Sequence, residues 1–137
     1  MNGIELIELL EDLFKNNNLL RGVNIVTDPY AKLEDYLPCI LIDYGKSRLK
    51  TASKGEVIGY FHSIDFFCLV SAHNKQHRVY KTEAIELAEK LLKALNDILD
   101  TRVRIVMKED TFEPQEIMIG SKKCSGILIN KEFETKI

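Results

Sequence analysis

The side chains best able to do chemistry in this chain are its three histidines. His73 and His77 stand four residues apart, a spacing that would place both imidazoles on one helical face as ligands of a metal ion. No Glu, Asp or Cys completes a recognised ligand spacing around them, so we interpret both as solvated residues at the start of a helix. His62 falls on the apolar side of a strand pattern, which favours a partly buried, hydrogen-bonded residue. We therefore expect no metal and no cofactor.

Three cysteines, Cys39, Cys68 and Cys124, form no close pair, and any disulfide scheme leaves one of them unmatched. Two of the three lie inside apolar runs, residues 38–42 and 66–70, where a free cysteine behaves as a small hydrophobic residue. No cysteine has the electropositive surroundings that activate a thiol nucleophile. This usage indicates a reducing compartment.

Carboxylates that could act as general acids or bases are numerous but recur at helical spacing. Glu83, Glu86 and Glu89 precede Lys90 and Lys93, a pattern typical of a solvated helix face with ion pairs four residues apart. The sequence contains neither a glycine-rich phosphate loop nor a nucleophile elbow. We expect the protein not to be an enzyme.

A cationic segment is the most distinctive local feature. Residues 45–55 carry two glycines and four cations with almost nothing to bury, which predicts a long loop or a protruding hairpin; the cations are Lys46, Arg48, Lys50 and Lys54. One interpretation is an interaction surface for phosphate or an acidic partner. The other is a soluble hairpin tip whose charges prevent edge aggregation. The segment has no aromatic residue for base stacking, which argues against sequence-specific reading of nucleic acid.

Length and composition set the frame for these residues. The chain has 137 residues, 45% of them hydrophobic and 29% charged, which excludes disorder and fibrous repeats. Nineteen Lys and Arg residues against 21 Asp and Glu give a net charge of −2, so a globally basic nucleic-acid binder is not expected. The length predicts a single domain over residues 1–137.

Hydrophobic periodicity predicts an α+β fold in the order α-β-β-β-α-β-β-β, with a mixed, mostly antiparallel sheet packed against two helices. The strand at residues 58–70 is apolar on both faces and is expected to be central or to meet another subunit. Asn74 is expected to cap the second helix. The predicted elements are helices at 4–15 and from Asn74 to Leu99, and strands at 23–27, 39–44, 58–70, 101–107, 111–119 and 124–130, with residues 131–137 as a possible extension.

The layout resembles the tail terminator proteins of long-tailed bacteriophages, also called tail-completion or tail-to-head joining proteins. The resemblance covers nearly the whole chain and is one of pattern without a signature motif. It is carried by the opening helix Ile4–Phe14, the Pro-led strand at 37–42, the strand ending at 65–70, the helix at 84–95 and the closing strand at 125–129.

This resemblance implies a structural protein of a phage or prophage tail, without catalytic residues. It implies a homo-oligomeric ring, expected to be a hexamer, that caps the tail tube, stops its polymerisation and contacts the head-connector protein. The cations of residues 45–55 would then meet a ring neighbour, the tube, or DNA in the lumen without sequence specificity. The alternative is a small dimeric ligand-binding or regulatory α+β module with a pocket between the second helix and the sheet.

The sequence also indicates where the protein works. The first residues lack the basic region of a signal peptide, and no uncharged stretch approaches the roughly 20 residues that span a bilayer. We expect no membrane contact and a place in the virion tail, assembled in the host cytoplasm.

Overall fold

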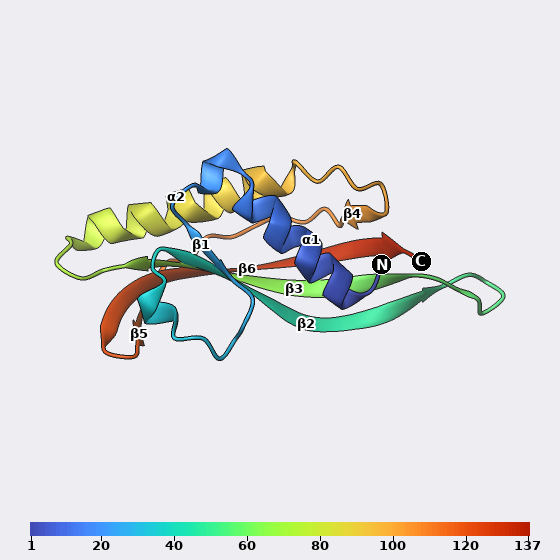
Figure 1. Ribbon diagram of the computed structural model, residues 1–137, viewed down its shortest axis with the longest axis horizontal. Helices are drawn as coiled ribbons and strands as arrows, with labels where there is room; N and C mark the ends of the chain where they lie inside the picture. Colours follow the sequence, from blue (N-terminus) through green and yellow to red (C-terminus); the bar gives the residue numbers. More distant parts are fainter.

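The computed structural model describes residues 1–137, and Figure 1 shows two helices lying on one side of a long, twisted sheet. Two short 3-10 turns, η1 and η2, precede the long strands. The elements in chain order are α1 (Gly3–Lys15), η1 (Asn18–Leu20), β1 (Asn24–Val26), η2 (Leu33–Asp35), β2 (Cys39–Thr51), β3 (Val57–Ser71), α2 (His77–Leu95), β4 (Val103–Ile105), β5 (Gln115–Ile119) and β6 (Lys122–Lys136).

The six strands form one sheet in the order β1-β2-β3-β6-β4, and β5 pairs with the other end of β6. Only the β1–β2 pairing is parallel, and all the others are antiparallel. The predicted α+β class, the mixed and mostly antiparallel sheet, and the order of helices and strands are therefore confirmed.

The core lies between the two helices and the sheet, and β3 is its central strand. Phe66 is fully buried and packs edge-on against Phe14 of α1 and Phe133 of β6, with ring centroids 5.8 and 6.3 Å apart. A smaller apolar cluster around Leu41 and Leu69 lies on the opposite face at the β1 end, where the segment 31–37 covers the sheet. The rest of that second face is called the open face below.

Helix α1 begins with a capping box, in which the Asn2 side chain accepts from the Glu5 backbone and the Glu5 carboxylate accepts from the Asn2 backbone. Its buried stripe consists of Leu6, Leu10 and Phe14. Ile4, which we expected to belong to this stripe, is instead 72% exposed. At about 100° per residue, Ile4 lies about 160° around the helix from the buried Leu6, so its side chain falls outside the buried stripe.

Helix α2 is shorter than predicted at both ends. It begins at His77 after Gln76, and the expected cap Asn74 adopts a left-handed conformation with φ 56° in the preceding turn. It ends at Leu95, and Leu99 lies outside it and is 92% exposed. Neither helix of the structure combines the length and apolar character needed to cross a membrane.

Several strand boundaries also differ from the prediction. β2 does not end at Tyr44 but continues to Thr51, because its second half pairs with β3 and therefore needs no apolar side chains of its own. β4 and β5 are confined to 103–105 and 115–119, where each meets β6. The extension of the last strand is confirmed, since β6 continues to Lys136.

Candidate functional site

The segment that carries the four cations is a β-hairpin, one of the two forms expected for it. β2 and β3 pair as far as Thr51 and Val57, and a tight turn joins them. In that turn the Ala52 amide donates to the Glu56 carbonyl at 2.8 Å, and Gly55 adopts a φ of 83° that favours glycine. We call residues 45–58 the arm; it projects from the sheet beyond the start of α1 (Figure 1).

A β-bulge at Gly45 decides which way the cations of the arm point. Before the bulge, Tyr44 lies opposite Ile64, whose side chain faces the helices; after it, Lys46 lies opposite Ser63, on the open face. The extra residue shifts the alternation of β2 by one position. The even-numbered residues Lys46, Arg48 and Lys50 consequently lie on the open face.

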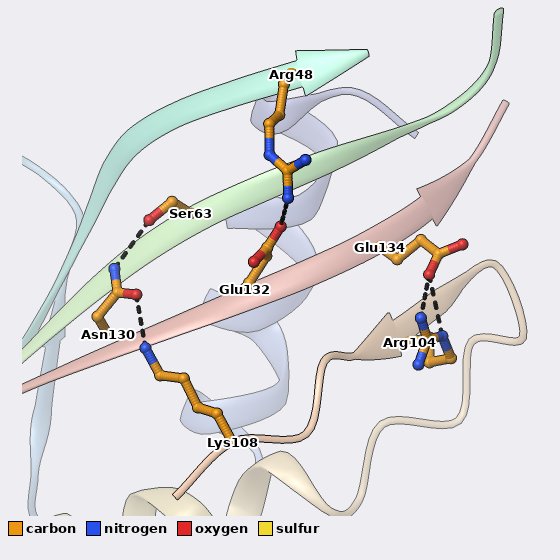
Figure 2. A network of polar contacts seen from close by, with 7 residues as sticks. All are labelled: Arg48, Ser63, Arg104, Lys108, Asn130, Glu132 and Glu134. Carbon is orange, nitrogen blue, oxygen red and sulfur yellow. Dashed lines mark hydrogen bonds and ion pairs between the residues drawn. The ribbon is translucent and has the colours of Figure 1, made fainter. Parts of the chain in front are cut away.

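Two of these cations are held by glutamates of β6. Arg48 forms an ion pair with Glu132, and Lys50 forms one with Glu134, which also binds Arg104 of β4. Figure 2 shows Arg48 reaching over β3 toward Glu132, with the Arg104–Glu134 pair further along β6. Hydrogen bonds from Lys50 and then Arg104 lower the pKa of the Glu134 carboxyl below its ordinary value.

The network continues toward the middle of the open face through Asn130. Its amide nitrogen donates to Ser63 Oγ at 2.9 Å, and its oxygen accepts from Lys108 Nζ at 3.0 Å (Figure 2). The same nitrogen also donates to Asp65 Oδ1 at 2.8 Å. Both the nitrogen and the oxygen of the Asn130 amide therefore have hydrogen-bond partners. This part of the open face is an ordered polar surface.

The four predicted interaction residues thus divide into two pairs. Arg48 and Lys50 are bound to carboxylates within the chain, whereas Lys46 and Lys54 form no ion pair. Lys46 lies at the base of the arm and Lys54 lies in its turn. The bulge brings Arg48 and Lys50 over β6, where the glutamates engage them. Lys46 and Lys54 are the two left for a partner.

The arm also carries apolar side chains that the fold does not bury. Leu49 is 57% exposed and Ile58 is 45% exposed. Leu49 lies opposite Tyr60, on the same side of the sheet as the helices but beyond their reach. In addition, β1 pairs only with Cys39–Leu41, so the outer edge of β2 from Ile42 onward has no strand beside it. Exposed apolar groups beside an unpaired edge are typical of an interaction surface.

His62 is buried and hydrogen-bonded, as its position in the strand pattern indicated. Its Nδ1 lies 2.9 Å from the Tyr44 hydroxyl, and its Nε2 lies 3.0 Å from Thr135 Oγ1 and 3.3 Å from the Met1 carbonyl. Burial lowers the pKa of His62 below its ordinary value. The residue joins the N-terminus to the last strand behind the base of the arm.

The other two histidines do not share a helical face. His73 lies in the turn before α2, whereas His77 is the first residue of the helix and its Nε2 lies 3.1 Å from Glu116 Oε1. Glu116 also accepts from the Tyr80 hydroxyl and lies 3.3 Å from Lys123 Nζ. The hydrogen bond to Glu116 raises the pKa of Tyr80. This cluster, which joins α2 to β5 and β6, escaped the sequence analysis because its members come from three separate segments.

The glutamates of α2 are arranged differently from the expected series of ion pairs. Glu83 pairs with Lys75 at 2.7 Å, in the turn before the helix. Glu86 and Glu89 form no ion pair with Lys90 or Lys93. The predicted pairing four residues apart is therefore wrong, although the face is solvated as expected.

A cavity of about 290 Å³ lies between the C-terminal end of α2 and residues 105–110. The Lys131 ammonium lines it and pairs with Asp110 at 2.6 Å, with only 8% of the lysine side chain exposed. This pair had no signal in the sequence, because Lys131 occupies a core-facing position of β6. Burial of so polar a group is tolerated because the carboxylate compensates its charge.

Comparisons with known proteins leave the function to be argued from this geometry. No protein-family model matches the chain, and no curated protein matches it either. The arm, the open face and the unpaired edge of β2 are therefore the features from which a function has to be inferred.

Proposed function

We propose that this chain is a tail terminator of a long-tailed phage or prophage. In this proposal, copies close into a ring, expected to be a hexamer, which caps the finished tail tube and receives the head connector. The mechanism is one of shape: one face of the ring matches the tube end, and the other does not template a further layer of tube. The work is done in the virion tail, assembled in the host cytoplasm.

The observation that carries the proposal is the arm. The arm is a hairpin that extends past the core, and its exposed Leu49 and Ile58 and its unpaired strand edge leave apolar and backbone groups available for association. Closed rings are built by head-to-tail contacts between two different surfaces of the same chain, and a protruding arm supplies one such surface. The arrangement of two helices on one side of the sheet agrees with the layout that the resemblance implies.

The unpaired cations have a place in this proposal as well. Lys46 and Lys54 are available for DNA that passes through the lumen of the ring, or for an acidic patch on the tube or connector. Contacts of this kind depend on phosphate charge and not on base identity, so they weaken steeply with salt. Arg48 and Lys50 contribute less, because Glu132 and Glu134 already neutralise them.

The first experiment is a mass measurement by light scattering after size exclusion, at two protein concentrations and at low and high salt. A mass near six subunits, or a shift from monomer to hexamer with concentration, is the expected result. A second experiment adds the purified chain to a polymerising phage tail-tube protein, and we expect tubes of limited length with a ring at one end. Tubes that grow equally long with and without the chain would contradict the proposal.

A second candidate function is a dimeric module that binds a small ligand. The cavity lined by Lys131 and Asp110 favours it, because an ion pair in the lining of a cavity offers both a donor and an acceptor to a ligand. A stable dimer in solution, together with a change in the thermal midpoint caused by small carboxylic or phosphate ligands, would support this function over the ring.

A further inference from the structure

We propose that the arm of one copy docks into a groove beside α1 of a second copy. The proposal deepens the proposed ring, on which it rests, by naming the two surfaces that meet. The groove lies between the first turns of α1 and the edge of β2, and it has a volume of about 690 Å³. The occupant is a second copy of this chain, and the argument comes from the apolar and charged groups on both surfaces.

The groove has an apolar floor that the fold leaves open. Ile4 and Ile7 line it from α1, and Tyr44 lines it from β2. Ile4 belongs to the apolar pattern of the helix but is 72% exposed, so the sequence supplies a hydrophobic side chain that the isolated chain does not bury. The groove begins where β1 ends, so it runs along the unpaired edge of β2.

The rim of the groove is acidic. Glu8 and Glu11 line it, and Glu8 has neither an ion pair nor a hydrogen bond from another side chain. Glu11 is only partly compensated, by Lys15 at 3.4 Å. A partner that fits this groove therefore needs an apolar strip next to at least one free cation.

The arm of the same chain has this composition. Leu49 and Ile58 are exposed, and Lys54 extends from the adjoining turn without an ion pair. Docking would bury Leu49 and Ile58 against Ile4 and would bring Lys54 to the glutamates of the rim. Both surfaces gain the kind of partner that each lacks alone.

A symmetric pairing of two β2 edges is the obvious competitor, and charge opposes it. Arg48 and Lys50 are neutralised by glutamates of β6, but Lys46 has no ion pair, so antiparallel pairing of two β2 edges would bring an uncompensated cation from each copy to the seam. Cations on an exposed edge strand are a common way to prevent such pairing. A contact between the arm and the groove joins two different surfaces and can therefore repeat around a ring.

Charge reversal tests the contact. Lys54→Glu and Glu8→Lys should each weaken self-association by about tenfold, measured by sedimentation or light scattering over a dilution series, because each places like charges together. The double variant K54E/E8K should restore most of the affinity, since it exchanges the two charges. The matched controls are Lys90→Glu and Glu89→Lys, which make the same changes on the exposed face of α2, away from both surfaces. Reversals that weaken association no more than these controls would overturn the proposal.

Cross-linking gives a second, independent readout. One preparation carries Ile4→Cys and the other carries Ile58→Cys, and oxidation of the mixture should yield a disulfide-linked pair of the two chains. The three native cysteines are buried, so they do not compete. Glu89→Cys mixed with Ile58→Cys is the control and should give several-fold less product. A chain that stays monomeric and yields no mixed product would also overturn the proposal.

The two readouts separate this contact from the proposed function. If the chain forms a hexamer whose stability is unchanged by the charge reversals, and no mixed disulfide forms, the proposed terminator function stands and the contact between arm and groove is refuted. If the chain forms a dimer, K54E/E8K restores its affinity and the mixed disulfide forms, the contact between arm and groove stands and the ring is refuted.

Discussion

Arg48 and Glu132 belong to strands that are not neighbours, yet they form an ion pair across the strand that separates them. The guanidinium of Arg48, on β2, lies 4.5 Å from the ring centroid of Phe61 on β3 before it reaches the carboxylate on β6. One side chain thus ties three strands together on the open face. The contact depends on the bulge at Gly45, which turns Arg48 toward this face.

The cations of the arm should differ in their effect on stability. Lys46→Ser with Lys54→Ser should change the free energy of unfolding by less than about 0.5 kcal/mol, since neither lysine has a partner. Arg48→Ser with Lys50→Ser should cost about 1 kcal/mol, because two exposed ion pairs and a contact with Phe61 are lost. Urea unfolding measures both, and the quadruple variant should remain folded. Equal effects of the two pairs would contradict the ion pairs of Arg48 and Lys50 with the glutamates of β6.

The register of the central strand can be tested at Phe66. Phe66→Ala should lower the free energy of unfolding by roughly 3–5 kcal/mol, because the ring is fully buried between Phe14 and Phe133. Phe61→Ala, on the open face of the same strand, is the matched control and should cost clearly less. A loss below about 1 kcal/mol at Phe66 would mean that the face assigned to it is wrong.

Gly59 leaves no room for a side chain between β3 and β6. A Cβ at Gly59 would lie 2.3 Å from the Thr135 carbonyl oxygen, so Gly59→Ala requires a backbone shift and should cost about 1–3 kcal/mol. At Gly45 the nearest atom, the Ser63 carbonyl oxygen, would be 3.1 Å away, and Gly45→Ala should cost less. Thermal midpoints of the two variants give the comparison, and the opposite ranking would refute the pairing of Gly59 with the last strand.

His62 should make stability depend on pH. Its pKa is lowered in the folded chain, so the unfolded chain binds a proton that the folded chain does not between that pKa and the ordinary value near 6.5. The free energy of unfolding should therefore fall as the pH drops below about 6.5, by up to about 1.4 kcal/mol per pH unit from this one group. Urea midpoints at pH 8 and pH 5 measure the effect, and His62→Gln should show a smaller difference. If the difference between the urea midpoints at pH 8 and pH 5 is the same in His62→Gln as in the unmodified chain, other groups cause the pH dependence.

The three thiols should be inert in the folded protein. Burial raises the pKa of Cys39 to about 11 and that of Cys68 to about 12, and it raises the pKa of Cys124 as well. Thiolate, the reactive form, is therefore scarce at pH 8. A colorimetric thiol reagent should titrate none of the three within minutes in buffer and all three in denaturant. Rapid reaction of one thiol in buffer would show that its strand opens locally.

The order of elements was predictable because each helix and each long strand carries its own local periodicity. Phe66 and its neighbours in β3 show the alternation of a buried strand without reference to the rest of the chain. The end of β2 was not predictable in this way, because Lys46–Thr51 is held by pairing with β3 and by glutamates about 80 residues further along. Asn74 does not cap α2, because it lies in the turn before the helix and adopts a left-handed conformation there.

The candidate surface was predictable only in composition. The sequence located the cations of the arm and the form of the hairpin, which are local properties. It could not show that Arg48 and Lys50 are neutralised while Lys46 and Lys54 are not, since this division follows from one extra residue at Gly45 and from the register with β6. The exposure of Ile4 was missed for a different reason, because the apolar pattern of the helix is wider than the stripe Leu6, Leu10 and Phe14 that the core buries.

The bulge at Gly45 changes the face of the sheet on which the even-numbered residues of β2 lie. Ile40, Ile42 and Tyr44 face the helices before the bulge, whereas Lys46, Arg48 and Lys50 lie on the open face after it. Deletion of Gly45 would remove the bulge and let Lys46 follow Tyr44 in regular alternation, so the three cations would stay on the open face. One strand therefore serves two surfaces from positions of the same parity: its first half supplies apolar side chains to the core, and its second half supplies cations to the opposite side of the sheet.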